Sequence, residues 1–119
     1  MKKIAFILAL LTTSGLANAE AGYRKGKVFN IRVHDTKENP NWAPPLFWFT
    51  LEGVTSAGAC PLFNGKVLFV MDSDSAMSII LAAEMADREV SIRYDDTQKH
   101  VDGWCKAGHL TIGDPVPLM

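Results

Sequence analysis

The chain has 119 residues, with 12 lysines and arginines against 13 aspartates and glutamates, so its formal net charge is −1. This length is typical of one domain. The near-neutral balance excludes the strongly basic surface by which proteins bind nucleic acid or anionic lipid.

The first 19 residues have the pattern of a secretory signal peptide. Lys2 and Lys3 precede an apolar run at residues 4–11, and residues 17–19 read Ala-Asn-Ala, which is typical of a cleavage site. The apolar run is too short for a membrane-spanning helix, which takes about 20 residues. We therefore expect no membrane insertion, a single mature domain at residues 20–119 that begins at Glu20, and a periplasmic or secreted location.

Cys60 and Cys105 are the two cysteines of the sequence. In an oxidising compartment, an isolated pair is more often a disulfide than a metal site or a nucleophile. A bond between these two cysteines would close the loop of chain between them, and in the chain-entropy model a loop of that length stabilises the folded chain by about 4 kcal/mol. We predict the disulfide, and the alternative is two free, buried thiols.

Short apolar segments along the mature chain predict five strands. Alternation of Phe29, Ile31 and Val33 with polar residues is typical of a half-buried strand, whereas continuous apolar runs indicate strands covered on both faces. The predicted strands are residues 27–33, 46–51, 66–71, 89–94 and 109–112. Asn64 and Gly65 indicate a tight turn before the third strand. The loops are expected at residues 34–45, 52–60 and 95–103, and residues 20–26 are expected to be loose.

A helix is predicted at residues 75–87, with Ser73 or Asp74 as its cap, because their side-chain oxygens accept from first-turn amides. The element order is then β-β-β-α-β-β. Five short strands with one helix after the third is the order of an OB-fold, a small Greek-key barrel. The alternative is an open antiparallel sheet with the helix on one face.

The predicted helix has more apolar surface than one buried face requires. Ala76, Ile79, Ile80 and Ala83 form one stripe, which can cover the end of a barrel. Met77, Leu81 and Met85 form a second, whereas a surface helix usually has one. Either the loop at residues 34–45, with Trp42, folds over the second stripe, or this stripe is the interface of a homo-oligomer.

Residues 26–96 contain the segments GKVFNIRVHD, PLFWFTLEG, ACPLFNGKV and DSDSAMSIILAAEMADREVSIRYDD. In element order and pattern this region resembles the B subunits of bacterial AB5 toxins, especially the subtilase-cytotoxin and pertussis-like group, and related small secreted proteins of Gram-negative bacteria. The resemblance implies an OB-fold, a ring assembled through the helix and strand edges, and recognition of host-surface glycans. The cysteines depart from that group's pattern, and no sugar-binding residue is carried over.

No motif in the sequence indicates catalysis or a cofactor. His34, His100 and His109 lack the ligand spacing of a metal site, and there is no G-x-S-x-G segment. A disulfide would also leave no thiol nucleophile. We therefore expect a protein that is not an enzyme and that holds neither a metal nor a cofactor.

The candidate ligand-binding residues are Trp42, Asn41, Trp104 and His100. Loop tryptophans can stack on a sugar ring or anchor a protein partner, and the other two residues supply hydrogen-bonding groups beside them. The alternative is that each tryptophan covers the barrel core. We expect an exported, non-catalytic binding protein that recognises a glycan or another cell-surface ligand. The main alternative is a monomeric periplasmic inhibitor of a protein partner, and a small hydrolase is the third hypothesis.

Overall fold

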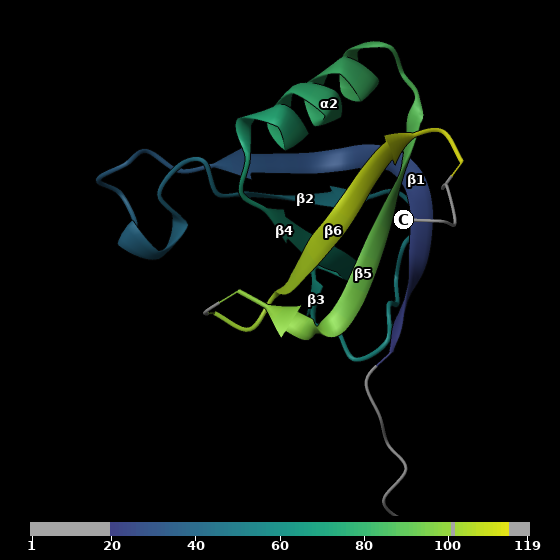
Figure 1. The fold of residues 1–119 in the computed structure, drawn as a ribbon, viewed down its shortest axis with the longest axis horizontal. Helices are drawn as coiled ribbons and strands as arrows, with labels where there is room; N and C mark the ends of the chain where they lie inside the picture. The colour runs from purple at the N-terminus through teal and green to yellow at the C-terminus, as the bar shows by residue number, and fades with distance from the viewer. Residues whose placement is uncertain (1–19, 101, 115–119) are drawn as a thin grey trace, which may run out of the picture.

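The computed structural model describes residues 20–100 and 102–114 (Figure 1). The predicted signal peptide lies outside the described residues. The strands of the described residues are β1 (Ala21–Val33), β2 (Phe47–Leu51), β3 (Leu62–Phe63), β4 (Lys66–Met71), β5 (Glu89–Lys99) and β6 (Cys105–Ile112). The helices are a single 3-10 turn, η2 (Pro40–Trp42), and α2 (Asp74–Met85). Within the described residues, no helix is long and apolar enough to cross a membrane.

Five of the strands close into a barrel in the order β1-β2-β4-β6-β5 and back to β1. The β4–β6 pair is parallel and the other pairs of the ring are antiparallel. The short β3 forms a hairpin with β4 outside this ring, through the predicted turn at Asn64 and Gly65. The closed ring, with its helix between β4 and β5, confirms the predicted OB-fold-like barrel.

The barrel interior is filled by side chains that alternate inward along each strand. The register places Ile31, Phe49, Phe69 and Cys105 in one row across β1, β2, β4 and β6. Phe49 and Phe69 are fully buried, and their ring centroids lie 5.9 Å apart. Tyr94, on β5, is buried in the same core. A small barrel packed in this way leaves no lumen for a ligand, so any binding surface lies outside it.

Helix α2 lies across one end of the barrel (Figure 1). Of the two predicted caps, Ser73 is the one that caps the helix, because its Oγ accepts a hydrogen bond from the Ala76 amide at 3.0 Å. The core stripe buries Ala76, Ile80 and Ala83. Ile79, predicted in the same stripe, is 37% exposed and lies at its margin.

The second apolar stripe of α2 stays largely open. Met77 is half-buried, Leu81 is 43% exposed and Met85 is 86% exposed. The loop before β2 does not cover the stripe with Trp42, because that side chain packs in a separate cluster against Trp48 of β2. Met77 packs against the core, whereas Leu81 and Met85 stay exposed among the described residues.

Three strands are longer than the sequence predicted. Residues 21–27 pair with residues 89–95 of β5, so the expectation that residues 20–26 are loose was wrong. Strand β5 also continues through polar residues to Lys99, and the predicted turn region at 95–103 is shorter in consequence. Similarly, β6 begins at Cys105 rather than at 109. These extensions are held by backbone pairing, which a polar sequence does not reveal.

The predicted disulfide is present. Cys60 and Cys105 are joined with Cα atoms 5.6 Å apart, across a sequence separation of 45, and no described cysteine is free. The bond ties the loop before β3 to the start of β6. A structural disulfide of this kind indicates an oxidising compartment.

Candidate functional site

The outer surface of the barrel has a row of side chains that crosses four strands. The register pairs Arg32 of β1 with Trp48 of β2, Trp48 with Val70 of β4, and Val70 with Lys106 of β6. Side chains alternate between the two faces of a strand, and the residues next to these four in sequence point into the core, so this row faces outward. Strands β2 and β4 are the second and third strands of the ring, and in OB-folds that face binds oligonucleotides and oligosaccharides.

Aromatic side chains cover the middle of this face. Trp48 is only 6% exposed although it points outward, because Phe63 of β3 and Trp104 pack in the same cluster. The Phe63 ring lies edge-on to Trp48, with centroids 5.3 Å apart, and edge-on to Trp104 at 6.4 Å. Phe63 and Trp104 are half-buried and therefore keep exposed ring surface.

Cations lie beside aromatic rings along the same side of the barrel. The Arg32 guanidinium lies 5.2 Å from the centre of the Trp48 ring, and the Lys66 ammonium lies 4.3 Å from that of Phe29. Phe29 is 54% exposed at an irregularity in the β1–β2 register between Val28 and Asn30. Cation–π contacts hold donor groups and apolar rings together at the surface. We name Arg32, Trp48, Phe63, Lys66 and Trp104 the aromatic face.

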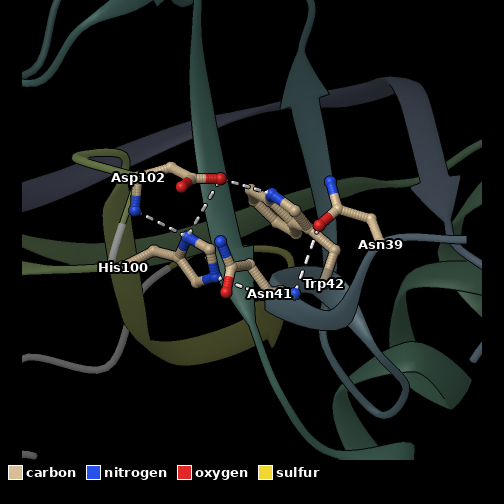
Figure 2. Close-up of polar contacts among 5 residues, drawn as sticks. All are labelled: Asn39, Asn41, Trp42, His100 and Asp102. Carbon is tan, nitrogen blue, oxygen red and sulfur yellow. Dashed lines mark hydrogen bonds and ion pairs between the residues drawn. The ribbon is translucent and has the colours of Figure 1, made fainter.

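Two loops meet through side-chain contacts (Figure 2). They do so at the margin of the aromatic face, since Trp42 packs in the same cluster as Trp48 and Trp104. The Trp42 indole Nε1 donates to Asp102 Oδ2 at 2.7 Å, and His100 Nε2 lies 2.8 Å from the Asn41 carbonyl oxygen. The ring centroids of Trp42 and His100 are 4.1 Å apart, with the planes tilted by 32°. These contacts join the loop between β1 and β2 to the loop between β5 and β6, the two loops that flank the ligand face of an OB-fold.

Local sequence explains how each loop presents its contacts. The Asn39 side chain accepts a hydrogen bond from the Asn41 amide at 3.2 Å and caps η2, while Pro40 supplies a helical φ at its first position. In the other loop, the Asp102 amide donates to His100 Nδ1 at 3.1 Å. Because Nδ1 accepts, Nε2 carries the proton of the neutral imidazole and donates to Asn41.

The structure brings three of the four predicted ligand residues into this loop contact. Trp42 and His100 are 5% and 6% exposed, so they hold the loops together and present no free ring face. Asn41 is exposed and contributes its backbone carbonyl. Trp104, the fourth, belongs to the aromatic face but adjoins this contact, because its carbonyl accepts a hydrogen bond from the His100 amide at 2.7 Å and its side chain packs in the same cluster as Trp42.

Sequence reasoning missed Arg32, Trp48, Phe63 and Lys66. Trp48 lies in a run that is apolar at successive positions, and this run was correctly interpreted as covered on both faces. Which aromatic rings provide the outer cover depends on the pairing of β2 with β1 and β4. A single sequence contains no direct signal for that register.

Two hollows adjoin the site. One, of about 210 Å³, opens where β4 and β6 diverge, and is lined in part by Leu46, Ser73 and Lys106. It is smaller than the pockets that enclose drug-sized ligands, which measure about 300–1,000 Å³. A groove of about 490 Å³ runs between α2 and the loop before β2, with Met77 and Pro45 among its lining residues. Among the described residues, no three His, Cys, Asp or Glu side chains form a group that could hold a metal ion.

Comparison of the chain with protein-family models, curated proteins and solved structures finds no match. The fold and the site define the class of the protein: a disulfide-bonded, five-stranded OB-fold-like barrel with an aromatic outer face.

Proposed function

We propose that this chain is an exported, non-catalytic binding protein that recognises a glycan on a cell surface. The observation that carries the proposal is the aromatic face, in which half-buried rings lie beside cationic side chains on the ligand-binding side of an OB-fold-like barrel. The signal-peptide pattern supports export to the periplasm or the medium, and the disulfide fits either destination.

The composition of the aromatic face favours a sugar as the ligand. A sugar ring has an apolar C–H surface that can pack on Trp104 and Phe63, and hydroxyl groups that can accept from Arg32 and Lys66. The face is shallow, which suits an extended chain of sugars better than a small molecule that needs an enclosing pocket.

The resemblance to AB5-toxin B subunits suggests that several copies assemble. The exposed stripe at Leu81 and Met85 supports this part of the proposal, because these apolar side chains stay uncovered among the described residues. Assembly would place several aromatic faces on one particle, and multivalency raises the avidity of weak single sites by about 10²–10⁴.

The groove beside α2 favours a second candidate function, inhibition of a protein partner. Its lining is largely apolar and includes Ile31, Val33 and Leu81. Such a groove can accept an apolar anchor from another protein. In that case the chain would act as a monomer, and the aromatic face would take no part in binding the partner.

A glycan array probed with the oxidised chain 20–119 tests the proposal. We expect binding to a restricted set of glycans, and a loss of at least tenfold in affinity, about 1.4 kcal/mol, for Arg32→Ala and for Trp104→Ala. Arg88→Ala is the matched control, since Arg88 is an exposed arginine in the turn between α2 and β5. Absence of glycan binding, with capture of one protein that Leu81→Glu abolishes, would favour the inhibitor instead.

A further inference from the structure

Glu20 is fixed to β5 through both its backbone and its side chain. Its backbone nitrogen donates to Asp96 Oδ1 at 2.8 Å, and its carbonyl accepts from the Asp96 amide at 3.0 Å. Its carboxylate accepts from the Tyr94 hydroxyl at 2.7 Å. The residue that the signal-peptide pattern makes the first of the mature chain is therefore held in place before β1 begins.

The Asp96 carboxylate occupies a built site. Asp96 is 7% exposed, and its other oxygen accepts from the Ala59 amide at 2.8 Å. A Cβ atom at Gly58 would lie 2.5 Å from that oxygen, so glycine leaves room for the carboxylate. Hydrogen bonds from the Ala59 and Glu20 amides hold the pKa of Asp96 below its usual range. The group is therefore ionised at neutral pH, and none of the ion pairs found among the described residues involves it.

We propose that removal of the signal peptide completes this site, because the new α-ammonium group of Glu20 forms an ion pair with Asp96. Hydrolysis of the bond between Ala19 and Glu20 by a signal peptidase consumes one water, leaves a carboxylate on Ala19 and leaves an ammonium group on Glu20. The inference rests on the proposed export. It assigns a structural consequence to the cleavage, which the export proposal does not.

The cleavage changes the strength of a contact that the chain already makes. A peptide nitrogen has one N–H donor and no charge, whereas an ammonium group has three donors and a positive charge. Charge-assisted hydrogen bonds are about twice as strong as neutral ones. The nitrogen is already 2.8 Å from the carboxylate, so little rearrangement is needed to gain this interaction.

The position of the pair gives it a structural role. It lies at the end of the seam in which residues 21–27 of β1 pair with 89–95 of β5, and this seam helps to close the barrel. Ala59, which also donates to Asp96, precedes Cys60 of the disulfide. Signal-peptide removal therefore stabilises the seam and the disulfide-linked loop together, and the mature chain is more stable than its precursor.

The stabilisation has a defined pH window. An unperturbed α-amino group has a pKa of about 7.7–8.0, and pairing with Asp96 raises it in the folded state. The stabilisation from the ion pair is fully present below the pKa that the α-amino group has in the unfolded chain. It is lost as the pH rises through the pKa that this group has in the folded chain. At acid pH it is lost as Asp96 is protonated. The other charged or titratable groups that act at this site are the Glu20 carboxylate, Tyr94, Arg24, Asp95 and Lys99.

Two forms of the chain 20–119 provide the test, one with a free Glu20 amine and one selectively acetylated there. The acetyl group restores the single neutral N–H of the precursor and changes nothing else. At pH 7 we expect the free-amine form to have a Tm several degrees higher, with the difference vanishing above about pH 10. Asp96→Asn should abolish the difference. Asp95→Asn is the control and should preserve it, because the Asp95 side chain accepts its hydrogen bonds within β5, from the amide and hydroxyl of Thr97.

Equal Tm values for the two forms at pH 7, or a difference that persists in Asp96→Asn, would overturn the ion pair. If Asp96→Asn does not fold, NMR titration of the ¹⁵N-labelled α-amine replaces it: we expect a pKa above about 8, and a value in the ordinary range contradicts the proposal. The intact mass of the protein exported by a bacterial host separates the two proposals. Retention of residues 1–19 contradicts export and this inference together, whereas cleavage at Glu20 with equal Tm values contradicts the ion pair alone.

Discussion

The Trp42 indole donates a hydrogen bond to the Asp102 carboxylate at 2.7 Å, across 60 positions of sequence (Figure 2). This contact connects the two loops that flank the aromatic face, and His100 packs against the same indole ring. The loop before β2 is long and has little regular structure, so its conformation depends on such contacts. The hydrogen bond and ring packing at Trp42 therefore fix one margin of the proposed ligand surface.

Replacing Trp42 with phenylalanine should weaken the contact between the two loops while leaving a smaller aromatic ring at this position. The variant loses the Nε1–H donor, and a hydrogen bond to a charged group contributes about 1.5–3 kcal/mol. We expect the lower end of that range, since Asp102 is partly solvated, with faster amide exchange at residues 39–42. Lys37→Ala, in the same loop, is the control. Unchanged exchange in Trp42→Phe would show that ring packing alone fixes the loop.

Removing the disulfide should cost much of the stability of so small a domain. The double variant Cys60→Ser, Cys105→Ser is expected to lower the free energy of unfolding by about 4 kcal/mol, because the unfolded chain regains the entropy of a long loop. Urea denaturation of the oxidised protein and of the variant measures the difference. A loss below about 1 kcal/mol would mean that the bridge constrains the unfolded chain far less than this model assumes.

Neighbouring positions on α2 separate core from surface. Ile80 is fully buried and Leu81 is 43% exposed, so Ile80→Glu should unfold the chain while Leu81→Glu should leave its circular dichroism unchanged. If the second stripe joins copies in an oligomer, Leu81→Glu should also reduce the native mass to that of a monomer. Unfolding of Leu81→Glu would instead assign this residue to the core.

Two strand glycines differ in the space around them. A Cβ at Gly26 would lie 2.6 Å from the Glu52 carbonyl oxygen, whereas at Gly108 the nearest atom would be 3.9 Å away. Gly26→Ala should therefore lower the free energy of unfolding by about 1–3 kcal/mol through overpacking, while Gly108→Ala should be tolerated. Thermal denaturation compares them, and equal effects would show that β2 can move to accommodate the methyl group.

The fold was largely predictable where apolar side chains determine it. The runs at 46–51 and 66–71 matched β2 and β4 to within one residue, and Ser73 was one of the two residues predicted to cap the helix. The ends of β1 and β5 were missed because backbone pairing, together with the Asp96 contacts to Glu20 and Ala59, extends them through polar sequence. Such contacts join positions far apart in the chain, and local pattern does not contain them.

The candidate site was only partly predictable. The two loop tryptophans predicted as ligand residues, Trp42 and Trp104, differ in burial because one ring is covered by His100 and the other packs edge-on to Phe63 at the surface. Arg32 joined the site through its register with Trp48. Composition indicates which residue types bind ligands, whereas strand register decides which of them share a face.

Glycan binding at the aromatic face is tested by NMR chemical-shift mapping of the oxidised chain 20–119 during titration with the strongest ligand from the glycan array. We expect the largest shifts at Arg32, Phe63, Lys66 and Trp104, and little movement of the resonances of α2. Shifts concentrated at Met77 and Leu81, or the absence of any glycan that binds, would contradict glycan binding at this face.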